Sequence, residues 1–398
     1  MAGNRTLGKA KAAKNDEFYT QYADIEREVN AYLAFSPDTF RGKSVLLPCD
    51  DPKWSHFTRY FAQNFTALGL KRLVSTGYAV RRKRDLGLLP GFGEEEADGD
   101  EALEHGTIFT LDRDSNGNGV IDMDDIVGRP MRGDGDFRSD EVKALRDEAD
   151  IIVTNPPFSL FREFLPWIME GKCLTQRRRD AEGWRDVPIA PKKFLVIGNL
   201  NAVSYVEMFP LIQAGRIWLG ATGSGSDMVF GVPEGAAVSQ ADRDKAAKLG
   251  YVGNYTRLGN SCWYTNLDHG RRHEPLQLMT WADNVKYSRH KEIRGRGYVR
   301  YENYDAIEVP FVDAIPSDFD GVMGVPRSFL ERHNPEQFEI VGIAEGESGK
   351  SLGLKPVPKE LKKRNRSLRD GQLYYFENGE PMKPYARILI RKRKGFDA

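Results

Sequence analysis

The tetrapeptide Asn155-Pro156-Pro157-Phe158 has the residue types in this chain that are best suited to chemistry. It follows the apolar run 151–154, which predicts a buried strand that ends in a rigid polar loop. The Asn155 side-chain oxygen and the Pro156 carbonyl can each accept a hydrogen bond from an amino group conjugated to a planar ring. Two acceptors would draw that nitrogen towards tetrahedral geometry and aim its lone pair at an electrophile. The prolines fix φ, and Phe158 offers a face on which the ring can stack.

The plain alternative is a strand followed by a proline-rich turn. Because proline makes up about 5% of ordinary sequence, the tetrapeptide arises by chance in roughly one chain per several hundred of this length. This rarity favours a catalytic role, and we expect all four residues to belong to the catalytic site.

Strands and helices alternate along residues 16–225, and the alternation predicts an α/β fold with a Rossmann-like, doubly wound, mostly parallel sheet. We expect buried strands at 44–48, 72–76, 151–154, 194–198 and 216–220, and helices near 25–33 and at 54–68, 141–149 and 160–168. Ligands bind at the carboxyl ends of such strands, where Asp50, Asp51 and Asn155 lie. We expect a catalytic domain at 16–225, preceded by a flexible arm at 1–15. Short strands and turns rich in Tyr, Gly and Pro predict a second region at 226–398.

Length and composition allow two domains in the 398 residues. No apolar stretch approaches the roughly 20 residues that a membrane span needs, and the N-terminus lacks an apolar signal region. Cys49, Cys173 and Cys262 are too scattered for a disulfide framework, so the chain is predicted to be cytoplasmic. The net charge is zero, but the last 44 residues carry 13 Lys and Arg against 5 Asp and Glu. This excess fits either a solvated face or a phosphate-binding surface.

The segment 133–137, Gly-Asp-Gly-Asp-Phe, lies just before the helix that leads into the Asn155 strand. The Asp136 carboxylate could accept a hydrogen bond from the exocyclic amine of a purine, and Phe137 could stack on the purine ring. The alternative is a Gly/Asp turn on the surface. Its position one element before the tetrapeptide favours the purine site.

An acidic loop at 114–125 matches the spacing of an EF-hand calcium loop and lies inside a long polar insertion at about 81–135. Gly119 occupies the position of the sharp turn, and an Asp stands last, where a bidentate Glu is commoner. We expect a structural calcium ion. The alternative is a solvated loop of Asx and Gly turns, which would have a similar sequence. The predicted metal ligands are Asp114, Asn116, Asn118, Val120, Asp122 and Asp125.

Arginines and tyrosines alternate near residue 300, where Arg294, Arg296 and Arg300 precede or flank Tyr298, Tyr301 and Tyr304. Interleaved cations and aromatics suit contact with nucleic acid. An edge strand with one aromatic face has the same pattern, so both interpretations stay open here.

Several segments taken together resemble the EcoRI-type adenine-N6 DNA methyltransferase family, and the resemblance runs from about residue 14 to 345. The segments are 14–21, 49–52, 133–139, 155–163, 262–269 and 304–309. The resemblance implies a class I methyltransferase fold and methyl transfer from S-adenosylmethionine to adenine N6 in duplex DNA, with the target base flipped out of the helix. It also implies that the region 226–398 recognises DNA. Whether a cognate restriction endonuclease is a partner in the same system stays open.

The cofactor-binding residues that this interpretation implies lie in three of the segments or, for Pro48, directly before one. They are Phe18, Tyr19, Thr20, Pro48, Cys49, Asp50, Asp51, Asp136 and Phe137. The chain departs from the wider methyltransferase pattern, because Cys49-Asp50-Asp51-Pro52 replaces the usual glycine-rich loop. The second strand also ends in 76–78, Thr-Gly-Tyr, without an acid for the ribose hydroxyls. The residues that hold the ribose and methionine parts of the cofactor therefore stay open.

Two other functions compete with this prediction. An RNA adenine or protein glutamine methyltransferase could use the same tetrapeptide, because the tetrapeptide can hold any planar amine or amide. A DNA-binding protein that no longer catalyses is the other alternative. The long basic C-terminal region favours duplex DNA as the substrate, and the intact tetrapeptide favours catalysis.

Overall fold

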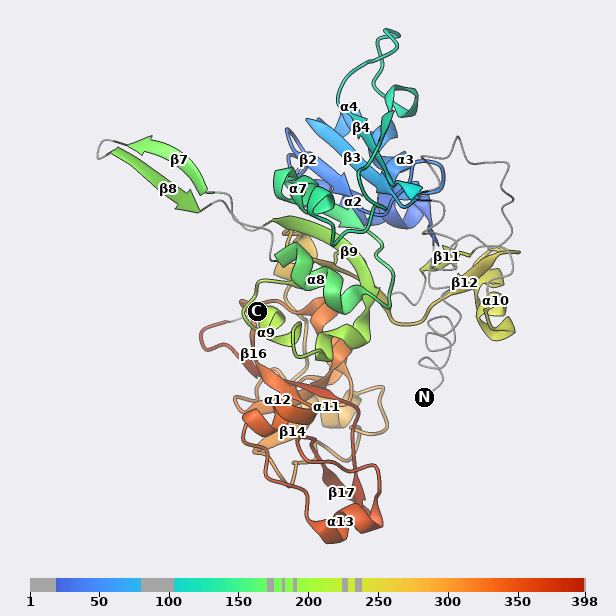
Figure 1. Ribbon diagram of the computed structural model, residues 1–398. Helices are drawn as coiled ribbons and strands as arrows, with labels where there is room; N and C mark the ends of the chain where they lie inside the picture. Colours follow the sequence, from blue (N-terminus) through green and yellow to red (C-terminus); the bar gives the residue numbers. More distant parts are fainter. Residues whose placement is uncertain are drawn as a thin grey trace. The chain divides into compact units, whose positions relative to one another are not determined.

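The computed structural model describes residues 19–79, 104–169, 175–180, 183–188, 192–223, 228–232 and 238–396. The chain divides into two compact units (Figure 1). Unit 1 comprises 1–199 and 220–268, and unit 2 comprises 200–219 and 269–398. The division therefore differs from the expected boundary near residue 225, because segment 220–268 packs with unit 1 and 200–219 with unit 2. The expected N-terminal arm lies outside the described residues.

Parallel strands form the centre of the large sheet in unit 1, in the order β3 (Arg72–Gly77), β2 (Ser44–Leu47), β6 (Ile151–Thr154) and β9 (Lys193–Asn199). Antiparallel strands flank this centre, with β13 (Ser261–Thr265) beside β9, and β4 (Thr107–Leu111) and then β5 (Val127–Pro130) beside β3. This mixed sheet confirms the predicted α/β class. It also corrects one detail, since the described part of the 81–135 insertion contributes two strands to the sheet.

Helices lie on both faces of this sheet, with α7 and α8 in front of it and α2 and α3 behind it (Figure 1). Their bounds are α2 (Tyr22–Phe35), α3 (His56–Gln63), α4 (Phe65–Leu68), α7 (Asp140–Glu148) and α8 (Phe161–Met169). The expected single helix at 54–68 breaks at Asn64 into α3 and α4. Side-chain oxygens of Ser55 and Ser139 accept backbone N–H groups at the starts of α3 and α7, which fixes where these helices begin.

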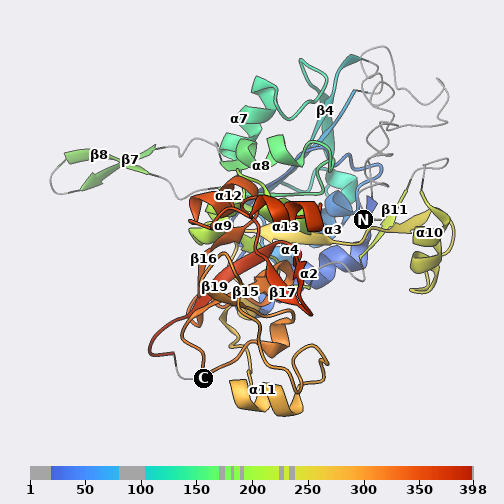
Figure 2. The same ribbon diagram turned by 90° about the horizontal axis from the view of Figure 1, so that it is seen from below.

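A small antiparallel sheet accompanies the large one in unit 1, in the order β1 (Tyr19–Thr20), β11 (Val229–Gly231) and β12 (Tyr255–Arg257). Helix α10 (Gln240–Ala247) packs beside β12 (Figure 2). A hairpin of β7 (Thr175–Asp180) and β8 (Gly183–Pro188) completes the described elements of this unit, together with the 3-10 turn η2 (Met123–Asp125).

Unit 2 is built on a sheet with the order β14 (Ala306–Glu308), β15 (Val322–Pro326), β19 (Arg387–Lys392) and β16 (Phe338–Ala344). The strands β17 (Tyr375–Glu377) and β18 (Glu380–Met382) form a hairpin. The strand β10 (Trp218–Leu219) is shorter than the predicted strand 216–220. The helices are α9 (Phe209–Gln213), α11 (Trp281–Tyr287), α12 (Gly346–Ser351) and α13 (Lys359–Arg364). The 3-10 turns are η3 (Leu200–Ser204), η4 (Gly270–His273), η5 (Val312–Ala314) and η6 (Arg327–Arg332). Across the described ranges, no helix is long and apolar enough to cross a bilayer.

A buried ion pair lies within the sheet of unit 2. The Arg387 guanidinium on β19 donates to both oxygens of Glu308 on β14, with Nε 3.0 Å from Oε1. The Tyr301 hydroxyl donates to Glu308 as well, and burial raises the pKa of this phenol well above its usual value. All three residues are at most 8% exposed, so each polar group depends on the others for its hydrogen bonds.

Replacing Arg387 alone with Met should lower the free energy of unfolding by about 3–5 kcal/mol, because Glu308 would be left as an uncompensated buried charge. Denaturant titration measures this loss. The variant Y301F/E308L/R387M removes all three polar groups and should unfold closer to the wild type than R387M does. A smaller loss in R387M than in the triple variant would show that the pair contributes no mutual compensation.

Candidate functional site

A tight turn follows β2 at the carboxyl edge of the parallel strands. Cys49 has a φ of 70°, in the left-handed region, and its backbone N–H donates to Thr76 Oγ1 on β3 at 3.1 Å. The Cys49 thiol lies 3.4 Å from the Tyr78 hydroxyl. Beside this turn, a Cβ on Gly77 would lie 2.8 Å from Asp51 Oδ2, so only glycine leaves room for the Asp51 side chain there. The turn after β2 is therefore in contact with the end of β3 through Cys49 and Asp51.

The Asp50 carboxylate is buried and connects three elements at this edge. Its Oδ1 accepts from the Ser55 hydroxyl at 2.7 Å, and Ser55 caps the start of α3. Its Oδ2 lies 2.5 Å from the hydroxyl of Thr154, which is also 2.8 Å from the Pro48 carbonyl. The Asp50 carbonyl accepts from the Thr58 hydroxyl at 2.6 Å. Since Thr154 directly precedes Asn155, this network fixes the point at which the tetrapeptide leaves β6.

A cleft opens above these residues and brings together parts of the chain that are far apart in sequence. Its lining residues are Tyr19, Thr20, Cys49, Asp50, Asp51, Trp54, Ser55, His56, Phe57, Tyr78 and Asn155. Six of these were singled out from the sequence as catalytic or cofactor-binding residues, and they come from β1, the turn after β2 and the end of β6. The predicted Phe18 lies outside the described residues.

The sequence interpretation missed the five lining residues Trp54, Ser55, His56, Phe57 and Tyr78. Two signals could have indicated some of them. Ser55 is a favourable N-cap residue directly after the Cys49–Pro52 segment, and Tyr78 follows β3 at the same edge of the sheet. Burial raises the pKa of Tyr78 well above its usual value, with Cys49 and Asp136 adding to the shift, so its hydroxyl keeps its proton at neutral pH.

Thr20 shows that this cleft has a polar group to offer a ligand. Its side chain is 4% exposed, and its hydroxyl has no hydrogen-bond partner within the described part of the chain. The Thr20 carbonyl can only accept, and it lies 2.8 Å from His56 Nδ1, so His56 donates to it through Nδ1–H. An orphaned buried hydroxyl on a cleft wall fits a polar ligand that supplies the missing hydrogen bond.

The predicted purine site at 133–137 lies next to the end of β3. The backbone N–H of Ala79 donates to the Asp134 carbonyl at 2.9 Å, and a Cβ on Gly135, whose φ is 87°, would lie 2.7 Å from the Gly77 carbonyl oxygen. The Asp136 carboxylate holds the Arg138 guanidinium at 2.7 and 2.9 Å, and Arg138 also reaches Glu163 at 2.9 Å. The turn therefore lies beside Tyr78, as a cofactor site after β3 requires.

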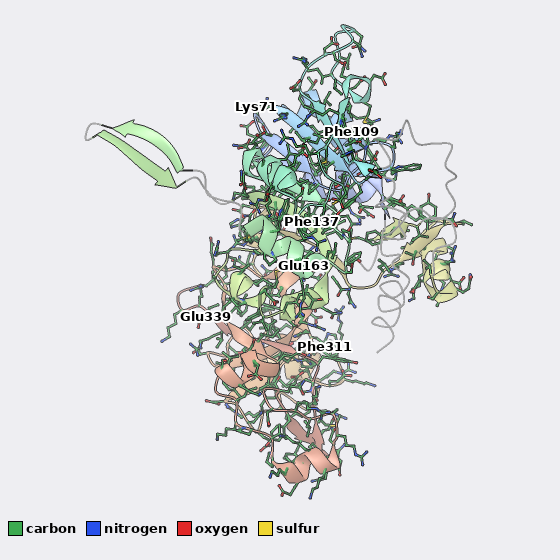
Figure 3. The ribbon with its side chains drawn as sticks, in the orientation of Figure 1. Lys71, Phe109, Phe137, Glu163, Phe311 and Glu339 are labelled. Atoms are coloured by element: carbon green, nitrogen blue, oxygen red, sulfur yellow. The ribbon has the colours of Figure 1, made fainter. Side chains whose placement is uncertain are left out.

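Phe137 does not have the open face that was expected. Figure 3 labels Phe137 in unit 1. Its ring is fully buried and packs edge-on against Phe164 and Trp167 of α8, at centroid distances of 5.1 and 5.5 Å. The prediction that Phe137 stacks on a purine is therefore wrong for this structure. Its role is to anchor the 133–137 turn to the helix that follows the tetrapeptide.

The tetrapeptide itself is divided between the cleft and the core. Asn155 is half-buried and lines the cleft, whereas Pro156 is buried. The Pro157 carbonyl accepts from the Leu160 N–H at 2.9 Å, which starts the turn into α8. Phe158 is 9% exposed and packs perpendicular to Phe230 of β11, at a centroid distance of 6.4 Å. The ring face that Phe158 was expected to offer is thus covered in this structure.

The acidic loop 114–125 is folded around its own backbone. Asp114 accepts the N–H groups of Gly117 and Gly119 at 2.6 and 2.7 Å. Asp125, which is 2% exposed, accepts those of Ser115 and Asp122 at 2.8 and 3.1 Å. Among the residues described, no three His, Cys, Asp or Glu side chains group as metal ligands.

The predicted DNA-binding residues lie in unit 2, where Arg294, Arg296 and Arg300 are exposed. Arg296 pairs with Glu377 at 3.6 Å and Arg300 with Asp305 at 3.0 Å. These exposed pairs are weak and leave the arginines accessible to solvent. Tyr301, in contrast, is buried in the sheet, so it is not part of an exposed aromatic face.

A family model described as adenine-specific methyltransferase EcoRI matches residues 6–174 and 187–393. The type II methyltransferase M.EcoRI of Escherichia coli is 38% identical over 394 residues, which cover 99% of this chain and 98% of that protein. The type II methyltransferase M.MpnI of Mycoplasma pneumoniae is 32% identical over 84% of each chain. M.MgeORF184P of Mycoplasma genitalium is also 32% identical, over 84% of this chain and 85% of its own length. No solved structure matches significantly.

The variant Thr154→Val keeps the shape of the side chain but removes the hydroxyl that lies against Asp50. It should lower the free energy of unfolding by about 1–3 kcal/mol, because Asp50 Oδ2 would lose a partner while staying buried. Thr154→Ser keeps the hydroxyl and should lose less. Equal stability of the Val and Ser variants in denaturant unfolding would show that this hydrogen bond does not hold the edge of the sheet together.

Proposed function

Since the chain belongs to the EcoRI family of adenine-specific methyltransferases, we infer that the cleft of unit 1 is the site where it methylates adenine in DNA. The protein is a type II adenine-specific DNA methyltransferase, and its family uses S-adenosylmethionine. One observation carries the assignment of the site. Asn155 lines the same cleft as Thr20, Cys49 and Asp51, so an acceptor for the target amine faces the candidate cofactor residues.

Asn155 and Pro156 would act on the adenine amine through hydrogen-bond acceptance. The Asn155 Oδ1 and the Pro156 carbonyl would each accept one N–H of the amine, which draws the nitrogen towards tetrahedral geometry and localises its lone pair for attack on the methyl group. S-adenosylmethionine supplies the methyl group as an electrophile. The protein contributes position and electrostatics, and the reaction needs no covalent bond to the chain.

The Asp50 network accounts for the precision that this mechanism needs. Methyl transfer depends on geometry, because a misplacement of about 1 Å can cost roughly a hundredfold in rate. Thr154 is held by Asp50 and Pro48 directly before Asn155, and Asp50 is held by Ser55. The two predicted cofactor residues Pro48 and Asp50 would therefore support the site, with the Asp50 oxygens turned towards Ser55 and Thr154.

The cofactor would be bound by the cleft residues Tyr19, Thr20, Cys49 and Asp51, joined by Tyr78. The buried Thr20 hydroxyl fits a polar group of the cofactor, and the Tyr78 hydroxyl offers a protonated donor. The turn that carries Asp136 lies beside Tyr78, at the edge of the sheet where the cleft is found. Asp136 is therefore proposed as an acceptor for the purine amine.

Duplex DNA as the substrate requires that the adenine leave the helix, because the amine cannot reach the cleft while it is paired. Flipping costs a few kcal/mol, which protein–DNA contacts must offset. We propose that Phe158 turns from its contact with Phe230 to stack on the flipped base. The exposed arginines Arg294, Arg296 and Arg300 would contact the duplex, with 226–398 as the recognition region. A cognate restriction endonuclease as a partner and a cytoplasmic location complete the proposal.

The experiment that tests this function is the sequencing of DNA from cells that express the protein, with detection of N6-methyladenine. We expect the modified base at one short recurring sequence. Parallel assays with labelled S-adenosylmethionine on duplex DNA, RNA and protein separate the alternatives. Methyl transfer confined to RNA or to protein glutamine, or none at all, would overturn the proposed substrate.

Asn155→Ala should abolish methyl transfer and leave S-adenosylmethionine binding largely intact, because the variant removes an acceptor for the substrate amine only. Single-turnover assays and calorimetry measure the two effects separately. Asn155→Asp keeps an acceptor oxygen at the same position and should retain measurable activity. Near-wild-type turnover of Asn155→Ala would rule out the proposed role.

Calcium binding at 114–125 is proposed as a structural addition that catalysis does not need. Each carboxylate oxygen of Asp114 accepts one backbone N–H group and has a second lone pair that can face an ion, as does Oδ2 of Asp125. Asp125 Oδ1 already accepts three hydrogen bonds from Ser115 and Asn116. The other proposed ligands are Asn116, Asn118, Val120 and Asp122.

Chelation should then lower the melting temperature, since an ion that binds only the folded state stabilises it by mass action. Activity should fall only as far as stability falls. Melting curves recorded in calcium and in chelator provide the measurement, and the Asp114→Asn variant, with a weaker ligand set, is the control. Curves that coincide in the wild type would exclude the ion.

A further inference from the structure

Helix α13 and the β17–β18 hairpin form a small platform, residues 355–383, at one end of unit 2 (Figure 1). It has its own apolar core, in which Val357, Leu368 and Tyr374 are buried and Leu361 of α13 packs against them. Asn303, which is 1% exposed, donates to the carbonyls of Lys355 and Gln372 at 3.2 and 2.8 Å. The platform is therefore a fixed part of unit 2.

Some cations of the platform hold it together. Lys362 pairs with Asp370 at 2.8 Å, and Asp370 also accepts the Val357 N–H at 2.9 Å. Arg364 pairs with Glu380 of the hairpin at 2.9 Å. Arg369 donates to the Leu368 carbonyl at 2.8 Å. These cations therefore stabilise the platform itself.

Three other cations of the platform have no such role. Lys359, Lys363 and Arg366 are exposed, and their side chains form no ion pair or hydrogen bond with any residue that the structure describes. Lys359 and Lys363 are one helical turn apart on α13, with their Cβ atoms about 5–6 Å from each other, so their like charges repel. A ligand with several negative charges would relieve that repulsion.

We propose that Lys359, Lys363 and Arg366 bind phosphates of the DNA backbone, so that the platform is a sequence-independent DNA contact of unit 2. The inference rests on the proposed function, because DNA is the polyanion that this enzyme must bind. Duplex DNA presents one negative charge per roughly 1.7 Å of its axis, which long lysine stems can follow without exact register. The braced helix has already lost its backbone freedom, so binding orders only the side chains.

The salt dependence of DNA binding tests this inference. Each phosphate that a cation neutralises adds about 0.9 to the steepness of log K against log salt concentration. The full-length variant K359A/K363A should therefore lose about 1.8 from the slope on a mixed-sequence duplex, and its affinity should fall most at low salt. K359R/K363R keeps both charges and should retain the wild-type slope. Thermal melting should be the same for all three proteins, because neither lysine braces the platform.

The outcomes separate this inference from the proposed function. A slope in K359A/K363A equal to that of the wild type would overturn the inference, and an acidic protein would then be the candidate occupant of the platform. If the three proteins bind DNA with the expected slopes but the wild type methylates no DNA, the result would support DNA binding by the platform and overturn the proposed reaction. A reduced slope in K359R/K363R as well would also count against it, since the charge is what the inference requires.

Discussion

The buried Asp50 carboxylate is the interaction on which the rest of unit 1 depends. A carboxylate at 6% exposure is costly unless it has hydrogen-bond partners, and here the Ser55 hydroxyl before α3 and the Thr154 hydroxyl on β6 lie within hydrogen-bond distance of it. Three elements meet at Asp50 at the edge of the sheet: the turn after β2, the start of α3 and the loop that begins at Asn155. Satisfying one buried charge therefore also sets their relative positions. Because these hydrogen bonds all lie at the carboxyl ends of the strands, they do not depend on the structure at the amino ends.

The two units use buried charge in different ways. In unit 1 the charge of Asp50 is met by neutral hydroxyls beside the cleft, whereas in unit 2 Glu308 is met by Arg387 inside a sheet. The first arrangement links the turn after β2 to the start of α3 and to the end of β6 through hydroxyl groups. The second links β14 to β19 within the sheet of unit 2. The cleft of unit 1 and the sheet of unit 2 thus have separate structural supports, and a change in one support need not weaken the other.

Much of the fold follows from the sequence, because the strands β2, β3, β6 and β9 are short apolar runs that can only be buried. The strands β4 (Thr107–Leu111) and β5 (Val127–Pro130) were not predicted, because they contain both polar and apolar residues and lie in an acidic insertion. Asn155 and Cys49, which line one cleft, were singled out by residue type. The burial of Phe137 and Phe158 was not predicted, because it depends on Trp167 and Phe230, which neighbour them only in the fold. Clefts assembled from distant segments leave little trace in local patterns.

The wall of the cleft that carries Thr20 is a strand of only two residues, paired through Tyr19 with Gly231 and through Thr20 with Phe230. So short a ladder has few cooperative neighbours, and such segments open at a fraction of the global unfolding free energy. A molecule that bridges this wall to the turn after β2 would connect a locally labile strand to a turn that is hydrogen-bonded to β3 and to Ser55. Occupancy of the cleft would then be recorded in the exchange rates of the amide hydrogens of β1 and β11, well before any change in the overall fold.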